Sequence, residues 1–299
     1  MSGVNITSNH IDDVVTIGEI DDFIFSCNQC NNTTTITLSG PASSNVAIVS
    51  NVCANTFTIT SGGIAFINKW AISGNTINAA LNLSNVSVNQ NSSITGNVMA
   101  SFSSTPGFND SIFSNNQVTT GNVSFSDVVT GCVIANNVIN SGSITFANNI
   151  SSTVIEGNRV NTNVSQSAGS VVNSNIVSNS TGGTLSLGII DSNDNTISQN
   201  KVVGVLTLGL TISNCTVDSN IASNIVISGG IIDCSITGNN CTSSTIAITG
   251  NSSDSVLNSN IARGGLSTGT SSGNNIITSN RNGGVTTNFG GGDVIANNL

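Results

Sequence analysis

Two carboxylates at equivalent positions in successive segments of the chain are the first residues that could do chemistry together. Asp233 and Asp254 lie 21 residues apart, and a repeating fold would stack them as neighbours. Such a pair could bind calcium, or act as a carboxylate dyad in which one group has a raised pKa. The alternative is turn capping, because Asp and Asn interchange in this column. We favour capping; the column comprises Asp22, Asn45, Asn91, Asn109, Asp194, Asn214, Asp233, Asp254 and Asn274.

The seven cysteines offer a second possible chemistry. Cys30 and Cys53 occupy one column of the repeat in neighbouring segments, and Cys215 and Cys234 share another. Stacked strands would hold each pair about 4.8 Å apart, which lies within the Cα range of a disulfide. The alternative, which we favour, is a set of small buried thiols made in a reducing compartment. Cys27 and Cys30 resemble half of a zinc site, but no second pair follows, so we expect no metal and no cofactor.

The elements that position these residues repeat about every 21 residues. Fifteen asparagines serve as anchors, and each has an aliphatic or aromatic residue three positions earlier, from Ile6 to Val294. A period of this length is typical of a solenoid, in which each unit buries its apolar face against the next. The anchors are Asn9, Asn28, Asn51, Asn75, Asn97, Asn115, Asn136, Asn158, Asn175, Asn200, Asn220, Asn239, Asn260, Asn280 and Asn297.

The columns around the anchor predict strands that meet at a corner. The position before the asparagine is small, as at Ser50 and Gly74, and the position two residues after it is mostly apolar, as at Ile77. We therefore expect the positions at minus three, minus one and plus two to point inward. Asparagine suits the corner because it tolerates the left-handed region, and stacked asparagines can hydrogen-bond along the axis as a ladder.

With these columns the chain resembles the right-handed parallel β-helix, the pectate-lyase-like architecture that has inward aliphatic stacks and an asparagine ladder. The resemblance covers residues 1–299 and concerns the fold pattern only. It implies an all-β solenoid of about 14–15 coils in a single domain, with an acidic first coil at 1–28 and a terminal coil at 283–299. The motifs of the polygalacturonase-type enzymes on this fold, paired Asp with Gly-His-Gly and Arg-x-Lys, are absent from the sequence.

The composition excludes some partners. Hydrophobic residues make up 37% of the chain and charged residues only 6%, with a net charge of -9. Five basic residues leave no electrostatic footprint for nucleic acid or an anionic membrane. No apolar run is long enough for a membrane span, and no signal peptide is visible. Trp70 is the only tryptophan and tyrosine is absent, so we expect Trp70 to pack in the core rather than to stack on a sugar.

We therefore expect a non-enzymatic structural or surface protein, a component of a virus particle, fibre or appendage, with glycan or receptor contacts. The alternative is a polysaccharide lyase or hydrolase. A third hypothesis is an ice- or lattice-binding solenoid, suggested by outward hydroxyls such as Thr35, Thr37, Thr58 and Thr60. An uncapped solenoid exposes strand edges. We therefore expect a homo-oligomer or larger assembly that associates through the coil ends, made in the cytosol with reduced cysteines.

Overall fold

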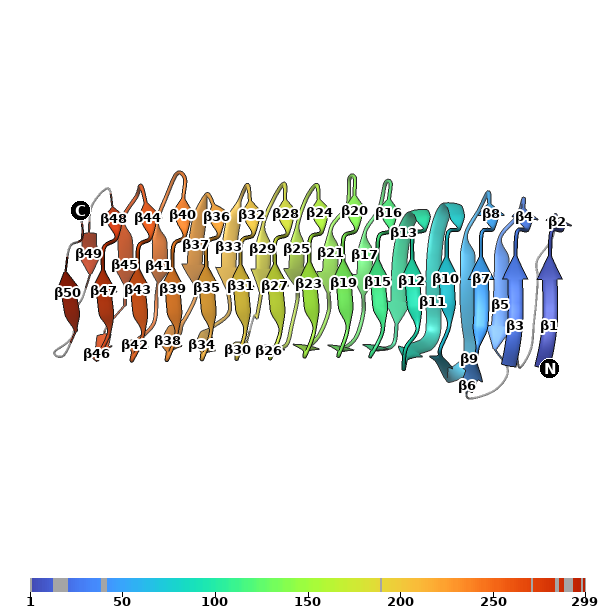
Figure 1. The fold of residues 1–299 in the computed structure, drawn as a ribbon, viewed down its shortest axis with the longest axis horizontal. Coiled ribbons are helices and arrows are strands. Elements are labelled where there is room, and N and C mark those ends of the chain that lie inside the picture. Colours follow the sequence, from blue (N-terminus) through green and yellow to red (C-terminus); the bar gives the residue numbers. More distant parts are fainter. Residues whose placement is uncertain are drawn as a thin grey trace. The chain divides into compact units, whose positions relative to one another are not determined.

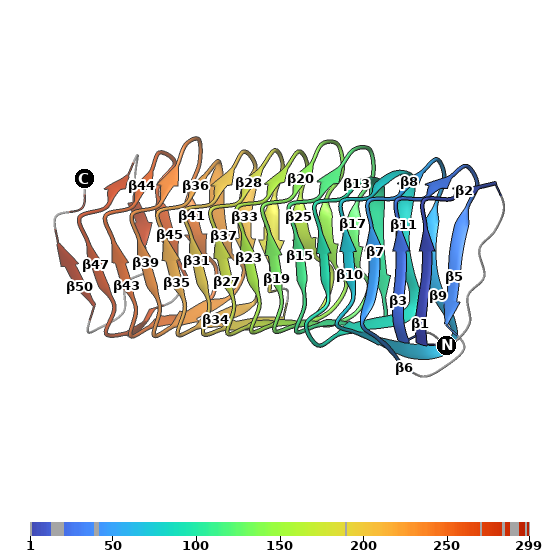
Figure 2. The ribbon, with the colours of Figure 1, turned by 45° about the vertical axis from the view of Figure 1, so that its right-hand side comes forward.

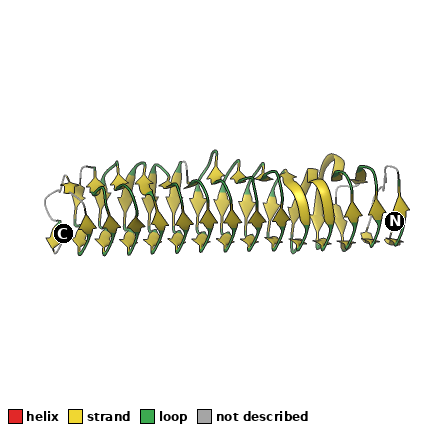
Figure 3. Cartoon of the chain, turned by 90° about the horizontal axis from the view of Figure 1, so that it is seen from above, coloured by secondary structure: helices red, strands yellow, loops and turns green. Residues whose placement is uncertain are grey.

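The computed structural model describes residues 2–12, 21–38, 42–188, 190–269, 271–282, 285–287, 293–296 and 298. These residues form only strands and loops, without a helix among them (Figure 3). Successive coils pair through parallel strands and build a β-solenoid of about 21 residues per turn. The predicted parallel β-helix is therefore confirmed.

The chain divides into two compact units. Unit 1 comprises Met1–Asn148 with Asn158–Asn161, and unit 2 comprises Asn149–Gly157 with Thr162–Leu299. Within each unit a coil contains up to four strand positions, which we call A to D in chain order. Position A leads into the ladder asparagine, the short position B follows it, and C and D complete the coil (Figures 1 and 2).

Unit 1 contains the longest strands. Position A consists of β1 (Ser2–Thr7), β3 (Asp21–Ser26), β7 (Val46–Val49), β10 (Ala71–Ser73), β12 (Ser93–Thr95), β15 (Ile112–Ser114) and β19 (Val133–Ala135). Position B consists of β2 (His10–Ile11), β4 (Gln29–Cys30), β8 (Val52–Cys53), β16 (Gln117–Val118), β20 (Val138–Ile139) and β24 (Arg159–Val160). Positions C and D consist of β5 (Thr34–Leu38), β6 (Ala42–Ser44), β14 (Phe108–Asn109), β17 (Val123–Phe125), β18 (Val129–Thr130) and β21 (Ile144–Phe146). Three strands span more than one position: β9 (Phe57–Asn68), β11 (Thr76–Asn89) and β13 (Val98–Thr105).

Unit 2 is more regular. Position A consists of β23 (Val154–Glu156), β27 (Asn175–Val177), β31 (Thr196–Ser198), β35 (Thr216–Asp218), β39 (Ser235–Thr237), β43 (Val256–Asn258), β47 (Ile276–Thr278) and β50 (Val294–Ala296). Position B consists of β28 (Ser180–Thr181), β32 (Lys201–Val202), β36 (Ile221–Ala222), β40 (Asn240–Cys241), β44 (Ile261–Ala262) and β48 (Arg281–Asn282). Position C consists of β25 (Val164–Gln166), β29 (Leu185–Leu187), β33 (Val205–Leu208), β37 (Asn224–Ile227), β41 (Ile246–Ile248), β45 (Leu266–Thr268) and β49 (Val285–Thr287). Position D consists of β22 (Ile150–Ser151), β26 (Val171–Val172), β30 (Asp191–Asn193), β34 (Thr211–Ser213), β38 (Gly230–Ile232), β42 (Ser252–Ser253) and β46 (Ser271–Gly273).

An asparagine ladder runs along each unit, as predicted, and is buried except at its end residues Asn9 and Asn298. In every step the side-chain Nδ2 of one asparagine donates to Oδ1 of the next at 2.8–3.2 Å. The backbone N–H of the first asparagine donates to the same oxygen, as from Asn75 to Asn97 at 3.0 Å. Asparagine fits this position because its side-chain amide accepts hydrogen bonds at Oδ1 and donates them from Nδ2 at the same time. The ladders are Asn9, Asn28, Asn51, Asn75, Asn97, Asn116, Asn137 and Asn158 in unit 1, and Asn179, Asn200, Asn220, Asn239, Asn260, Asn280 and Asn298 in unit 2.

Three predicted anchors are wrong. Asn115 and Asn136 precede the true ladder residues by one position and hold left-handed backbone, each with φ of 55°. Asn175 is an exposed residue of strand β27, and Asn179 takes the ladder position. Asn297 lies outside the described residues. With these corrections the ladder steps range from 18 to 24 residues instead of the expected 17 to 25.

Of the three positions that we expected to point inward, the one directly before the asparagine does not. The residue before the ladder asparagine points outward, as exposed Cys27 does, while Asn28 itself is buried. The left-handed conformation belongs to that preceding residue, which has a φ of 56° at Cys27 and 63° at Gly74. Left-handed backbone disfavours bulky and branched side chains. The column is small for this reason, and not because it packs inward.

The core consists of stacked apolar columns from all four strand positions. Ile72 pairs in register with Ile94, and both are 1% exposed. In unit 1 aromatic rings fill the interior; those of Phe125 and Phe146 stack at 5.3 Å between centroids. Trp70 is 1% exposed, which confirms its predicted place in the core. Burial of each such side chain contributes about 1.5–3 kcal/mol.

A second ladder, which we did not predict, lies five positions before the first. In unit 2 the backbone N–H of Thr153 donates to Ser174 Oγ at 3.1 Å, and that of Ser174 donates to Asn195 Oδ1 at 2.8 Å. The chain of bonds resumes from the backbone N–H of Cys234 to Ser255 Oγ at 3.1 Å and from that of Ser255 to Asn275 Oδ1 at 3.2 Å. Small polar side chains therefore bridge the coils at the corner between positions D and A.

Parts of the predicted coil ends lie outside the described residues. Asp13, Glu19 and Gly290–Gly292 belong to this group, and association through the ends stays a prediction. Asp22 is described: it has a φ of 55° and accepts a hydrogen bond from Asn45 Nδ2 at 3.1 Å. It therefore lies in the same left-handed corner column as Asn45.

Candidate functional site

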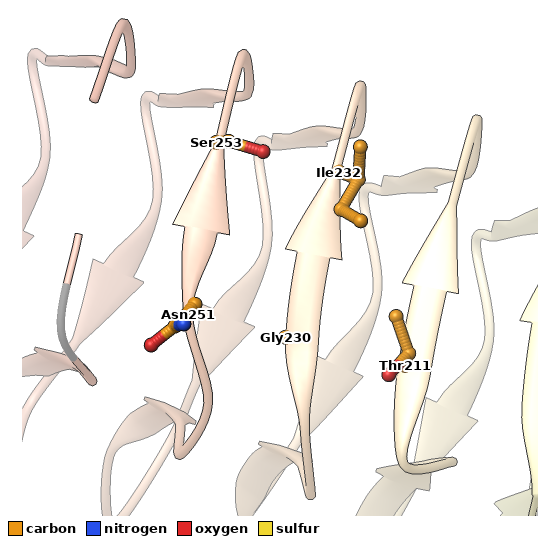
Figure 4. Close-up of a pocket in the computed structure, with 5 residues that line it drawn as sticks. All are labelled: Thr211, Gly230, Ile232, Asn251 and Ser253. Atoms are coloured by element: carbon orange, nitrogen blue, oxygen red, sulfur yellow. The ribbon is translucent and has the colours of Figure 1, made fainter. Parts of the chain in front are cut away.

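The candidate site is a shallow depression on the outer surface of unit 2. It has a volume of about 370 Å³ and is lined by Thr211, Gly230, Ile232, Asn251 and Ser253. Figure 4 shows these residues on three adjacent coils, with Gly230 and Ile232 on the middle strand. Gly230 pairs with Thr211 of β34. Because Gly230 has no side chain, the outer file of the sheet is interrupted there.

The lining combines one apolar side chain with several neutral polar groups. Ile232 is 43% exposed and provides an aliphatic wall. The hydroxyls of Thr211 and Ser253 and the amide of Asn251 can donate or accept hydrogen bonds. These groups can bind a small, uncharged molecule that has both hydroxyl groups and an apolar face.

The two predicted carboxylates lie at the corner that directly follows this depression. Asp233 follows Ile232, and Asp254 follows Ser253; both are exposed. Their φ angles of 53° and 52° are left-handed, a conformation that Asp and Asn tolerate better than most residues. Asn274 donates to Asp254 Oδ1 at 3.1 Å. The column is therefore a left-handed corner position, with Asp110 (φ 46°) in place of Asn109, which agrees with the interchange of Asp and Asn in the sequence.

The structure brings Asp233 and Asp254 together as neighbours in one corner file. The backbone N–H of Asp233 donates to Ser253 O at 3.3 Å, so the coils that carry the two residues are hydrogen-bonded beside them. Within the described part of the chain, no group of three or more His, Cys, Asp or Glu residues is arranged to hold a metal ion. The pair thus adds negative charge to the rim of the depression.

The seven cysteines are free thiols in the structure. Cys30 pairs in register with Cys53, and the thiols of Cys215 and Cys234 are hydrogen-bonded to each other. A hydrogen bond from Cys53 lowers the pKa of Cys30 to about 6. The hydrogen bond to Cys30, together with burial, raises the pKa of Cys53. The pair at Cys215 and Cys234 behaves in the same way, and the pKa of Cys215 is lowered to about 7.

The hydroxyl files behind the lattice-binding hypothesis are present on the outer face of position C in unit 1. Thr35 pairs in register with Thr58, and Thr37 pairs with Thr60. All four side chains are partly exposed. Further along unit 1, Thr145 Oγ1 donates to Ser124 Oγ at 3.1 Å, so neighbouring hydroxyls also bond to one another.

His10 is exposed and lies 3.2 Å from Asp12, and Asn31 donates to both residues. This small polar group at the first coils connects two loops. In the described residues no helix is long and apolar enough to cross a membrane.

Comparison with known proteins identifies no relative: no family model, no curated protein and no solved structure matches this chain.

Proposed function

We propose that this protein is a non-enzymatic structural or surface component of a particle, fibre or appendage. The observation that carries the proposal is the buried asparagine ladder, which continues through every described coil of each unit. It adds two side-chain-mediated hydrogen bonds per coil to those between the strands, as at Asn97 and Asn116. Buried amides that are fully hydrogen-bonded stiffen a core. A fold with this internal support suits a protein that displays a surface.

The outward side chains favour contacts with an uncharged partner. Hydroxyl and amide groups cover the strands, and charged residues make up only 6% of the chain. Such a surface binds through directional hydrogen bonds rather than through a long-range field. The partner that matches it is a neutral glycan, since a sugar ring presents hydroxyl groups around an aliphatic C–H face.

The depression at Gly230 is the place where we expect glycan contact. Ile232 would pack against the C–H face of a sugar, while Asn251 and Thr211 would bond its hydroxyls. Exposed polar contacts of this kind are each worth about 0.5–1.5 kcal/mol. We therefore expect weak binding that becomes useful when many copies are displayed together.

Localisation tests the structural role. Antibodies against the purified chain should label intact particles or appendages from its natural source, and the protein should co-sediment with them in a density gradient. Recovery only in the free soluble fraction, with unlabelled particles, would contradict the proposal.

Glycan contact is tested separately. The chain, multimerised on beads, should bind members of a panel of neutral glycans, and Ile232→Glu and Asn251→Ala should each weaken that binding. Ile221, which is 44% exposed on strand β36, provides the matched control as Ile221→Glu. Equal loss in the control, or unchanged binding in both depression variants, would place the contact elsewhere.

A further inference from the structure

The two stacked thiol pairs lie in chemically different columns. Cys215 and Cys234 occupy the second ladder, five positions before Asn220 and Asn239, where the other described coils of unit 2 have Ser, Thr, Asn or Asp. Their thiols contact backbone carbonyls: Cys215 Sγ lies 3.1 Å from Ser213 O, and Cys234 Sγ lies 3.2 Å from Ile232 O. Ser174 makes the equivalent bond to Val172 O at 2.9 Å. These cysteines therefore act as hydrogen-bonding substitutes for serine.

Cys30 and Cys53 have no such structural explanation. They stand two positions after the ladder asparagine, in a column that is mostly apolar, with Thr181 and a single Cys241 further along: Ile11 pairs with Cys30 on one side, and Ile77 pairs with Cys53 on the other. Both cysteines are almost completely buried, at 1% and 0% exposure. Their thiols are hydrogen-bonded to each other. An aliphatic side chain would fill this column without placing two sulfur atoms face to face.

A buried hydroxyl adjoins the pair. Thr34 is 0% exposed, and its side chain lies within reach of the Cys30 thiol. Its Oγ1 finds no nitrogen or oxygen partner among the described residues. A buried hydroxyl without such a partner costs about 1–3 kcal/mol. Three adjacent side chains with lone pairs thus face the interior of two successive coils, where apolar residues would be more stable.

The spacing of the strands fits a metal ion between the sulfurs better than a disulfide. In-register parallel neighbours lie about 4.8 Å apart. A disulfide draws the two Cβ atoms to about 3.8 Å, which requires the strands to approach each other. Two metal–sulfur bonds of about 2.3 Å each, the length known for zinc thiolates, span about 4.6 Å in a linear arrangement. Linear coordination therefore needs almost no movement of β4 and β8.

We propose that Cys30 and Cys53 bind one monovalent thiophilic cation, of the chemistry of Cu(I) or Ag(I), in a linear two-sulfur site beside Thr34. Soft thiolate ligands select such ions. When the cation binds, one of the two thiols releases its proton to solvent. One thiolate, one thiol and one monovalent cation carry no net charge, which a buried site requires.

Silver ion titration provides the test. All proteins carry Cys27→Ser, because Cys27 is an exposed thiol that would bind silver by itself. Native mass spectrometry in chloride-free buffer should show one tightly bound Ag(I) per chain, with sulfur-to-metal charge-transfer absorption in the ultraviolet. The ion should be lost in Cys30→Ala/Cys53→Ala; alanine already occupies this column at Ala222 and Ala262, both buried.

The matched control is Cys215→Ser/Cys234→Ser, which should keep the ion, because serine stands in that column at Ser174 and Ser255. Retention of silver without Cys30 and Cys53, or its loss in the control, would overturn the proposal. X-ray absorption on the protein with both cysteines present needs no core variant: two sulfur neighbours and no other ligand are expected. Any other coordination, or a Cys30–Cys53 disulfide in freshly purified protein, would also refute the assignment.

Discussion

Removing one ladder side chain from unit 2 should weaken the fold far beyond the effect of an ordinary surface substitution. Asn200 is 1% exposed. Its Nδ2 donates to Ile176 O at 2.8 Å, to Ser198 O at 3.1 Å and to Asn220 Oδ1 at 3.0 Å. Its Oδ1 accepts from the backbone N–H and from Nδ2 of Asn179, each at 3.0 Å. The change Asn200→Ala removes all five of these hydrogen bonds.

The cost follows from the groups that lose their partner. The backbone N–H of Asn179 and the carbonyl of Ile176 each lose the bond that they make to the Asn200 side chain. Each such buried group costs about 1–3 kcal/mol when it is unsatisfied. We therefore expect a loss of about 3–5 kcal/mol, which corresponds to a fall in melting temperature of roughly 10 °C for a unit of this size.

Thermal unfolding and hydrogen exchange measure this effect. The control is Asn251→Ala, at an exposed asparagine of the same unit, which should change the stability by less than about 0.5 kcal/mol. In Asn200→Ala the amide of Asn179 should exchange much faster than in the parent protein. A loss below about 1 kcal/mol with that amide still protected would refute the argument that the ladder stabilises the coils.

Three further changes have clear expected outcomes. Ile155→Asp, at a residue with 0% exposure, should abolish soluble expression because it buries an unpaired charge. Val154→Asp, on the outer side of the same strand, should be tolerated. Equal expression of the two variants would show that the column of Ile155 is not core. Asp233→Asn should leave the melting temperature unchanged. Asp233→Val should lower the free energy of unfolding by about 1–3 kcal/mol, because a branched residue is strained at φ 53°. If the parent protein cleaves a polysaccharide and Asp233→Asn does not, the protein is instead an enzyme. Burial raises the pKa of Cys132 from 9.0 to about 12, so the stability that the neutral thiol contributes is full below pH 9 and is lost as the pH rises towards 12. Above pH 9 the melting temperature of Cys132→Ser should therefore fall less steeply with pH than that of the parent protein. An identical pH dependence of the two melting temperatures would contradict this prediction.

The sequence by itself determined the repeat, the parallel β-helix, the apolar columns, the core position of Trp70 and the place of Asp233 and Asp254 in one corner column. Each of these depends on a side chain's preference within its own coil, and about 21 residues per turn repeat that preference often enough to be recognised. The stacking of Cys30 on Cys53 followed from the same alignment, and the structure places them in register.

Tertiary structure decided which of several asparagines joins the ladder. Asn115 and Asn116 both have an apolar residue three positions earlier, Ile112 and Phe113, so the local pattern cannot distinguish them. Stacking does: Phe113 pairs with Ile94, which leaves Asn115 in the left-handed corner.

The second ladder and the depression were not predicted, because the local sequence pattern does not specify them. The second ladder uses Ser, Thr, Asn and Cys interchangeably, because only a short polar group at the right depth is needed. The depression at Gly230 exists because three coils place Thr211, Ile232 and Asn251 around one missing side chain. Both features depend on contacts between residues about 20 positions apart, and those contacts are fixed only when the coils stack.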